Sequence, residues 1–307
     1  MIVCCGEALI DFLPRKLADG AAAYQPFVGG GIFNTSIALG RLGVKTGFFS
    51  GLSTDFFGDM LRDGLKASKV DLRYVKTWDK PSTLAFVKLT NGQAQYSFFD
   101  DNSASRMLTV KDLPRLDDKV EALHFGSISL IPEPGGSTLE ALMKREAKRR
   151  VLSIDPNIRP SQIKNRRAHV ARLNRMIAMT DIVKISDEDI EWMTGKRDLK
   201  AVARKWLKSG AKIVVITKGA DGMEGFTARD HIVQPAVKVK VADTVGAGDT
   251  INAGLLAALK DANLLDKKKL AVISGDQLAA AMAFAAKAAA ITCSRPGANP
   301  PWAKELA

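Results

Sequence analysis

The sequence predicts an α/β protein with a central, mostly parallel sheet flanked by helices. From residue 122 onward, apolar segments of strand length, such as DIVKIS (181–186) and KIVVITKG (212–219), alternate with segments of helical spacing. This alternation is typical of βαβ units, whose active sites lie beyond the carboxyl ends of the strands. With 307 residues, of which 46% are apolar, the chain is long enough to bury a full core.

The first hundred residues are expected to start the sheet and to carry a hairpin. IVCCGEALIDF (2–12) is nearly continuously apolar, as expected of one strand, and three glycines precede NTSIALGRLG (34–43), whose apolar spacing predicts a short helix ended by Gly43. STLAFVKLTNGQAQYSFF (82–99) alternates around Asn91-Gly92, a strong hairpin signal. A hairpin inserted so early is expected to form a lid.

The last third is expected to supply a smaller hairpin and core helices. GADGMEGFTARDH (219–231) is rich in turn residues and follows a predicted strand. VKVKVAD (237–243) has a strand-like alternation, and two Ala-rich segments, 254–265 and 276–291, have the spacing of buried helices.

The charge balance does not by itself require a nucleic-acid partner. The net charge is +12, and its main runs, MKREAKRR (143–150) and KNRRAHVARLNR (164–175), have the interleaved apolar positions of solvated helix faces. No aromatic residues interleave with them as a base-stacking platform, so nucleic-acid binding stays a minor alternative.

Membrane insertion and export are not expected. No segment approaches the roughly 18 apolar residues of a membrane span. MIVCCGEALI carries no basic leader, and the three cysteines lack the spacing of a zinc site or a disulfide framework. We therefore expect a cytoplasmic protein in a reducing compartment.

The segment DTVGAGDT (243–250) indicates chemistry on a phosphate. Its glycines precede an apolar helix, so the free N–H groups of the helix N-terminus can meet the charge of a transferring phosphoryl group. Asp249 would then accept the proton of an attacking hydroxyl, and Asp243 would bond turn N–H groups or hold a cation. The alternative is that both aspartates only stabilise a turn and cap a helix.

Two segments carry a family resemblance. DTVGAGDT resembles the C-terminal signature of the PfkB, or ribokinase-like, carbohydrate kinases, and VGGGIFNTSIALGRLG (28–43) resembles their N-terminal signature. Between them, DPNIRP (155–160), ISDEDIEWMTG (185–195) and TKGADG (217–222) extend the resemblance over the whole chain. It implies one ribokinase-like kinase domain, 1–307, with a small β lid whose elements lie within about 12–30 and 72–101.

The resemblance also implies roles for individual residues. Asp249 matches the catalytic base, and the anion hole matches Gly246, Ala247 and Gly248. Positions that hold the sugar match Asp11, Gly30, Gly31, Asn34, Phe98 and Arg106. Arg159 matches an arginine that reaches the transferred phosphate or the sugar, its alternative being a surface residue after a turn.

For the nucleotide, the resemblance implies ATP with Mg²⁺ and leaves a monovalent cation such as K⁺ open. The matching positions are Lys184, Thr217, Gly219, Gly222 and, in CSRPGANPP (293–301), Asn299. Many relatives have Asn-x-x-Glu where this chain has Ser186 to Asp189. For the metal we therefore rank Asp189 first and Glu188 second, with Asp243 as a further candidate. A capping role for Ser186, with acids in the first helical turn, is the alternative.

Within the family, CCGEALIDFLP (4–14) and FFDDNSASRMLT (98–109) most resemble bacterial fructokinases. The acids Asp100 and Asp101 at the rim would repel a sugar acid, and Arg106 can pair with them or bind a carboxylate. We therefore expect transfer to the 6-hydroxyl of D-fructose. Because lid hairpins of this family often form dimer contacts, the resemblance also implies a homodimer. The alternatives are a 2-keto-3-deoxygluconate kinase or another sugar or nucleoside kinase; a non-catalytic sugar-binding regulator is disfavoured because Asp249 is present.

Other nucleotide-binding classes lack their signatures in this chain. A dinucleotide-dependent oxidoreductase needs G-x-G-x-x-G after the first strand, which GGGIFN does not supply, and a P-loop enzyme needs G-x-x-x-x-G-K-[ST], which is absent. The small molecules that the family resemblance implies are a sugar and ATP.

Overall fold

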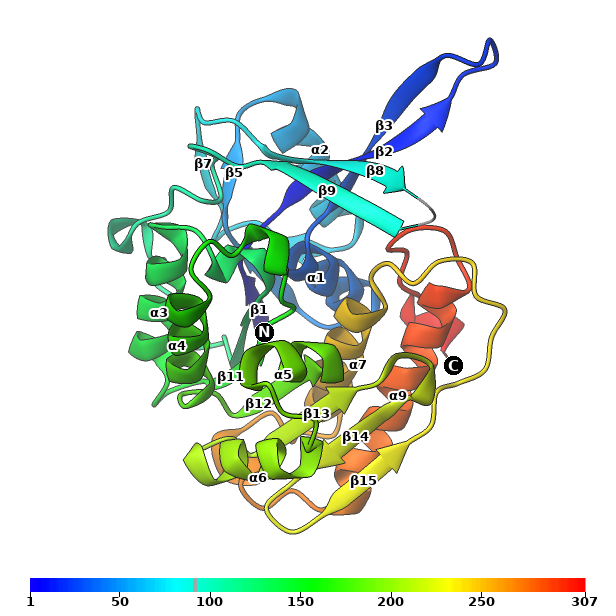
Figure 1. Ribbon diagram of the computed structural model, residues 1–307. Helices are drawn as coiled ribbons and strands as arrows, with labels where there is room; N and C mark the ends of the chain where they lie inside the picture. The colour runs from blue at the N-terminus through cyan, green and yellow to red at the C-terminus, as the bar shows by residue number, and fades with distance from the viewer. Residues whose placement is uncertain (91–92, 307) are drawn as a thin grey trace.

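The computed structural model describes residues 1–90 and 93–306, and a nine-stranded sheet runs through its centre (Figure 1). Across the sheet the strands are β15 (His231–Gln234), β14 (Met223–Phe226), β13 (Ile213–Thr217), β12 (Ile182–Ser186), β11 (Val151–Asp155), β10 (Ala122–Gly126), β1 (Ile2–Cys5), β4 (Thr46–Phe49) and β6 (Val70–Asp71). The pairs from β6 to β13 are parallel, and β14 and β15 are antiparallel. The predicted mostly parallel sheet is confirmed.

Helices cover both faces of this sheet, because its strands are apolar on both sides. One layer contains α1 (Gly31–Arg41), α2 (Phe56–Ala67), α7 (Ala247–Asp261) and α9 (Gly275–Cys293), and the other contains α3 (Gly135–Glu146), α4 (Arg166–Ile177), α5 (Asp187–Thr194) and α6 (Leu199–Ser209). The short α8 (Lys267–Leu270) lies between α7 and α9 in the chain. Successive residues of β1 enter different cores: Ile2 and Cys4 pack with the first layer, Val3 and Cys5 with the second.

A second sheet of four strands stands above one edge of the first (Figure 1). Its order is β3 (Ala22–Gly29), β2 (Leu9–Lys16), β8 (Thr83–Thr90) and β9 (Gln93–Phe99), and β5 (Gly51–Ser53) pairs separately with β7 (Lys76–Trp78). The predicted pairing across Asn91-Gly92 is confirmed, because β8 and β9 are antiparallel with Thr90 opposite Gln93. Asn91 and Gly92 themselves lie outside the described residues.

The prediction of one strand over 2–12 was wrong. The first strand, β1, ends at Cys5, and β2 begins at Leu9 in a different sheet. Gly6 lies where a Cβ atom would approach Ile32 Cγ1 to 2.6 Å and Ser129 Oγ to 2.8 Å, so the chain passes closely between two other segments at this point. An apolar run shows that a segment is buried, but it does not show that the segment stays in one sheet.

The strand predicted at 237–243 is also absent. The segment forms no strand, and its alternating valines, Val237, Val239 and Val241, are exposed by 42%, 38% and 60%. Two other predictions are confirmed. The first helix, α1, ends before Gly43, and residues 219–231 contribute to a small hairpin, β14–β15, which extends the main sheet. The helix expected over 143–150 ends at Glu146, whereas α4 covers most of 164–175.

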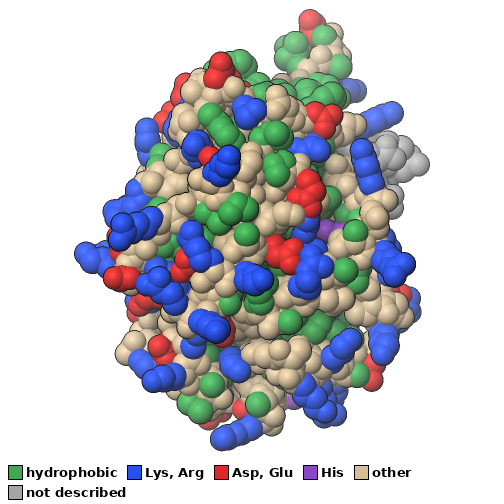
Figure 2. Space-filling view, turned by 90° about the vertical axis from the view of Figure 1, so that its left-hand side faces the viewer, with side chains coloured by type: hydrophobic (Ala, Val, Ile, Leu, Met, Phe, Trp, Pro, Cys, Tyr) green, Lys and Arg blue, Asp and Glu red, His purple; other side chains and the backbone are tan. Residues whose placement is uncertain are grey.

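In the described part of the chain, no helix has the length and apolarity needed to cross a membrane. On the face that lies to the left in Figure 1, Lys and Arg side chains are spread widely and are not gathered in a single stripe (Figure 2).

Candidate active site

The amino ends of α1 and α7 bring Asn34 and Asp249 together. The two helices pack side by side, and Asn34 Nδ2 donates to Asp249 Oδ2 at 2.9 Å. Thr35, one residue further along α1, donates through Oγ1 to the backbone oxygen of Asp249 at 3.4 Å. Asn34, which the resemblance assigns to the sugar, thus contacts the candidate base from a segment more than 200 residues away in the chain.

The carboxyl group of Asp249 is held at the pKa that a general base needs near neutral pH. Burial raises its pKa from 3.8 to about 7; the hydrogen bond from Asn34 and the charges of Lys184 and Arg159 lower it, and the charge of Asp155 raises it. A carboxylate with this pKa accepts a proton more readily than an ordinary one.

This pKa predicts the pH dependence of turnover. The base acts only when it is deprotonated, so kcat/KM for the sugar should fall tenfold per pH unit below about 7 and level off above it. Steady-state rates between pH 5.5 and 9, in buffers of constant ionic strength, measure this profile. A plateau that extends down to pH 5.5 would contradict the assignment of Asp249.

The turn before α7 leaves backbone donors unpaired. Gly246 is the N-cap residue with φ +78°, a left-handed conformation that suits glycine, and a Cβ there would lie 2.8 Å from that of Ala298. The N–H of Ala247 donates to Thr244 O at 3.2 Å. Within the described residues the N–H groups of Gly246, Gly248 and Asp249 have no protein acceptor.

This arrangement refines the predicted anion hole. The structure places the donors at Gly246, Gly248 and Asp249, whereas the N–H of Ala247 is engaged within the turn. Gly248 has an ordinary helical φ, and a Cβ there would lie 3.0 Å from Lys184 Nζ. Glycine at 248 therefore keeps the approach to this lysine open, and only Gly246 is required for the shape of the backbone.

A buried polar network under the turn was missed by sequence reasoning. Lys184 Nζ donates to Asp155 Oδ2 at 2.9 Å and Asn252 Nδ2 donates to the same oxygen at 2.7 Å; all three residues are buried. Lys184, predicted at the nucleotide, is therefore paired inside the protein, with its ammonium directly below Gly248. The only sequence signal for this network was Asp155 at the end of a predicted strand.

Arg159 lies among three acids that the sequence assigned to different tasks. Its positive charge lowers the pKa of Asp11, Asp189 and Asp249, although burial raises the pKa of Asp11 and Asp189 to about 6. The guanidinium is exposed and is oriented by Asn157, whose Oδ1 accepts from Nη1 at 2.7 Å. The arginine predicted to reach the phosphate or the sugar thus lies close to both the candidate base Asp249 and the candidate sugar ligand Asp11.

One face of the second sheet turns its polar groups towards the glycines at the start of α1. Asp11, Ala85 and Phe98 lie opposite one another across β2, β8 and β9, so their side chains share that face. A Cβ at Gly29 would lie 2.4 Å from Asp11 Oδ2, so this carboxylate lies directly over the glycine turn. Asp11 and Phe98 are therefore brought to the same region, as predicted.

Gly30 and Gly31 allow the side chains of Glu7 and Asn157 to pack closely against the backbone. Gly30 has φ +109°, and a Cβ there would lie 3.1 Å from Glu7 Cγ; a Cβ at Gly31 would lie 2.8 Å from Asn157 Nδ2. Glu7 is buried and accepts from the backbone N–H groups of Ile32 and Ser129. Burial raises the pKa of Glu7, and these hydrogen bonds oppose the rise. Glu7 was not predicted as part of the site.

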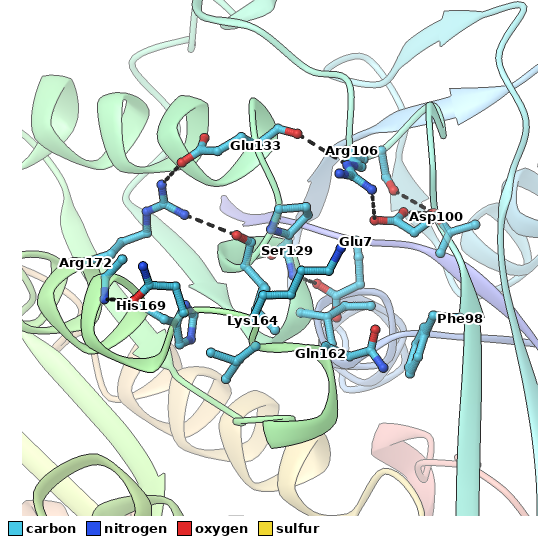
Figure 3. A pocket seen from close by; sticks show the side chains of 18 of the residues that line it. Glu7, Phe98, Asp100, Arg106, Ser129, Glu133, Gln162, Lys164, His169 and Arg172 are labelled. Atoms are coloured by element: carbon cyan, nitrogen blue, oxygen red, sulfur yellow. Dashed lines mark hydrogen bonds and ion pairs between the residues drawn. The ribbon is translucent and has the colours of Figure 1, made fainter.

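A cavity of about 660 Å³ lies next to this region, between the second sheet, the 128–133 segment and helix α4. Figure 3 shows Phe98 and Gln162 at one end of it, and His169 and Arg172 at the other. Neither Asp11 nor Asp249 lines it, so the chemistry belongs to the Asp249 cluster and the cavity adjoins it through Glu7 and Phe98.

Arg106 projects into this cavity but is already paired. Its Nη1 lies 2.7 Å from Asp101 Oδ1 and 3.9 Å from Asp100 Oδ2. Of the two possibilities that the sequence left open for Arg106, pairing with the rim acids is the one observed. This pairing leaves less positive charge for a substrate carboxylate.

Apart from Lys184, the predicted nucleotide positions lie in two segments of the chain, 217–222 and 293–301. Thr217 ends β13, Gly219 has φ +53°, and a Cβ at Gly222 would lie 2.2 Å from Gln234 O, so Gly222 permits the β14–β15 hairpin to close. Asn299 lies in the 293–301 segment, and its Oδ1 accepts a hydrogen bond from Arg41 Nη1 at 2.7 Å.

Asp243 ties the turn before α7 to the 293–301 segment. Its two carboxylate oxygens accept the N–H groups of Val245, at 3.0 Å, and Gly297, at 2.9 Å. The predicted turn-bonding role of Asp243 is therefore observed. Each oxygen keeps a further lone pair, so the geometry is compatible with a cation as well.

Of the two acids ranked for magnesium, Asp189 is the better placed. It lies near Asp155, Lys184 and Arg159, and Oδ2 accepts the N–H of Ile158 at 3.2 Å, whereas Glu188 is exposed. Ser186 caps α5 by accepting the N–H of Asp189, so the capping alternative is also observed. The described residues contain no group of three potential metal ligands. Mg²⁺ with one or two carboxylates, waters and phosphates needs no such group.

Together these residues can transfer a phosphoryl group to a hydroxyl. A buried carboxylate with a pKa of about 7 stands at the first turn of a helix whose free N–H groups can hold an anion. Backbone glycines and Asp11 offer a surface for a polyol beside that carboxylate.

Comparison with known proteins agrees with this chemistry. Residues 1–305 match the model of the pfkB family carbohydrate kinases. The chain is 55% identical over 278 residues to a fructokinase of Rhizobium leguminosarum bv. trifolii, covering 91% of this chain and 85% of the relative.

Two solved structures share the fold. A fructokinase of Xylella fastidiosa with bound ATP has a TM-score of 0.92 at 26% identity, covering 99% of this chain and 96% of its own. A fructokinase of Vibrio cholerae O395, a double mutant with bound fructose, ADP and potassium ion, has a TM-score of 0.84 at 25% identity, covering 97% and 93%. On its sequence, its fold and the geometry around Asp249, the chain belongs to the pfkB family of carbohydrate kinases.

Proposed function

We propose that this kinase transfers the γ-phosphate of ATP to the primary 6-hydroxyl of D-fructose. The observation that carries the proposal is the placement of Asp249, buried and bonded to Asn34, in the same helical turn as the unpaired N–H groups of Gly246 and Gly248. The relationship to fructokinases supports the choice of sugar.

In this reaction each side chain has a separate task. Asp11 and the backbone at Gly30 and Gly31 hold the hydroxyls of the sugar, and the ring lies against Phe98. Asp249 accepts the proton as the 6-oxygen forms its bond to phosphorus and the bond to the ADP oxygen breaks. The charge on the transferred group is met by the free N–H groups of the α7 turn and by Arg159.

The metal and the nucleotide would be held at the same edge of the sheet. Mg²⁺, which supplies charge neutralisation for the phosphates, would be held through Asp189, with Glu188 second. Thr217 and Gly219 would lie near the nucleotide phosphates, and Asn299 near the base. A K⁺ ion would lie near Asp243 in the adjoining turn. We place the reaction in the cytoplasm, as expected from the sequence.

The second sheet would act as the lid over the sugar. Its polar face carries Asp11 and Phe98, and its other face carries a cluster of aromatic rings in which Phe12 stacks on Phe86 at 4.5 Å. Tyr24 and Phe99 pack edge-on against Phe86 at 5.4 and 5.5 Å while remaining 48% and 61% exposed. This exposed aromatic face supports a homodimer that buries it against a second copy.

The dimer proposal predicts that Phe99→Glu yields a monomer. A charge in the centre of a buried aromatic contact is costly, so sedimentation velocity should show a dimer for the wild type and a single-copy species for the variant. Val272→Glu, at a 70% exposed residue between α8 and α9, is the control and should leave the dimer intact. A monomeric wild type at about 50 µM would refute the proposal.

The choice of substrate rests on Arg106. Because Asp101 and Asp100 already pair with it, a sugar acid that approaches Arg106 would meet two acids. We expect kcat/KM for D-fructose to exceed that for 2-keto-3-deoxygluconate by at least tenfold, about 1.4 kcal/mol of transition-state discrimination.

A coupled assay of ADP release with each sugar, ATP and Mg²⁺ measures this ratio. Asp101→Asn is the matched variant, because Asp101 is fully exposed and is the closer of the two acids paired with Arg106; it should move the ratio towards the acid. A tenfold preference of the wild type for the acid would overturn the choice of fructose and leave the kinase mechanism standing.

A further inference from the structure

A second cavity, of about 510 Å³, lies between α6 and the turn that joins β14 to β15. Residues 226–231 line one side of it, and residues of α6 line the other. In β14–β15 this turn lies at the opposite end from Gly222, which borders the nucleotide loop. The cavity therefore lies at the end of this hairpin that is remote from the nucleotide loop; α6 and the hairpin are near the bottom of Figure 1.

Positive side chains converge on this cavity from two elements. Lys200, Arg204 and Lys208 follow one another at four-residue intervals on α6, so they share one face of the helix. Arg229 joins them from the β14–β15 turn. All four are exposed, and none forms an ion pair with any described residue of the chain.

The acids of the region do not compensate this charge. Asp230, the one carboxylate that lines the cavity, accepts from the hydroxyl of Thr227 at 2.8 Å. Glu224, on β14, is paired with two other side chains: its Oε1 lies 3.0 Å from Lys218 Nζ, and its Oε2 lies 2.8 Å from His231 Nε2. Four cations thus face a concave surface with one engaged carboxylate among them.

Such a cluster is unfavourable without a ligand. Like charges at four-residue spacing on a helix repel one another, and a fourth charge from another element adds to this repulsion. An anion relieves it, and guanidinium and ammonium groups together suit phosphate oxygens. The net charge of the lining, about three positive, matches two phosphate groups, each of which carries about −1.5 to −2 near neutral pH.

The shape favours a small molecule. A cavity of this size lies within the range of about 300–1,000 Å³ typical of small-molecule sites. The aromatic rings that line its described part, Phe226 and His231, stack on each other at 4.5 Å. They form no row of separate faces on which successive bases of a nucleic acid could stack. We propose that the cavity between α6 and the β14–β15 turn binds a small anion carrying two phosphate groups.

Isothermal titration calorimetry with fructose 1,6-bisphosphate and with pyrophosphate tests this proposal. The titrations use the full chain at 100 mM KCl, with the active site filled by D-fructose and a non-hydrolysable ATP analogue. The two probes distinguish separated phosphate groups from a contiguous diphosphate. We expect the wild type to bind one equivalent of at least one of them.

The variant Lys200→Gln/Arg204→Gln/Arg229→Gln should weaken that binding at least tenfold. Its control is Lys119→Gln/Lys144→Gln/Lys148→Gln, which removes three equally exposed, unpaired lysines elsewhere and changes the net charge by the same amount. The control should bind like the wild type, and both variants should keep the wild-type melting temperature and turnover without the anion.

Three results would overturn the proposal. The wild type could bind neither probe under these conditions, or both triple variants could lose affinity equally, which would indicate a general charge effect. In the third case, a single-stranded RNA of 20 nucleotides would bind the wild type more tightly than either probe does. This binding would be lost in Lys200→Gln/Arg204→Gln/Arg229→Gln and kept in the control. That outcome would identify the surface as a nucleic-acid contact.

Discussion

Asp249→Asn should lower kcat by about 100- to 10,000-fold while changing the KM for the sugar little. The amide keeps the size of the side chain but cannot accept the hydroxyl proton, and a positioned proton acceptor contributes about this factor. Initial rates with ATP, Mg²⁺ and D-fructose give the comparison. Turnover within tenfold of the wild type would remove Asp249 from the mechanism.

The stability of the same variant provides its folding control. The pKa of Asp249 is raised by folding from 3.8 to about 7, so its contribution to stability is fully present below about pH 3.8 and is lost as the pH rises through 7. At pH 8 the wild type therefore buries an unfavourable charge that the asparagine lacks. We expect Asp249→Asn to melt at pH 8 at or above the wild-type temperature; a lower melting temperature there would contradict this linkage.

Lys184→Met should cost about 3–5 kcal/mol of the free energy of unfolding. The side chains of Lys184 and Asp155 are only 7% and 4% exposed, and removal of one partner leaves the other charge buried without compensation. Urea denaturation followed by tryptophan fluorescence measures the change. A loss below about 1 kcal/mol would show that the Asp155 charge is met in another way.

A double variant separates the charge from the packing. In Asp155→Asn/Lys184→Met the amide oxygen can still accept from Asn252, and no charge remains buried, so most of the lost stability should return. Lys144→Met, at an exposed lysine, is the control and should change the free energy of unfolding by less than about 0.5 kcal/mol.

The sequence predicted the parts of the fold that depend on local patterns. The alternation of apolar strand segments and helical segments predicted the main sheet. The Gly-rich turn before an apolar helix predicted that Asp249 lies at a helix N-terminus. The same reasoning failed at 2–12 and at 237–243. In both segments the local pattern indicates a strand, but the sheet that a segment joins, or the absence of any partner strand, depends on residues elsewhere in the chain.

The buried network shows the same limit within the site. Asp155 is bonded by Lys184 and by Asn252, which lie 29 and 97 residues away in the sequence. A lysine in an apolar strand and an asparagine in an apolar helix carry no sign that they share one carboxylate oxygen. Glu7 was missed for a similar reason, because its partners Ile32 and Ser129 come from two other elements.

The four residues from Gly246 to Asp249 carry both the proposed proton acceptor and the N–H groups proposed to bind the phosphate. All of these groups lie within one turn of the backbone. Their separation is set by covalent geometry, so no movement of the second sheet can alter it. In the proposed mechanism these groups are ordered by folding, so only the two substrates, the sugar and ATP, remain to be aligned at each turnover. Substitutions in the second sheet can therefore change which polyol is phosphorylated while the machinery of transfer stays intact.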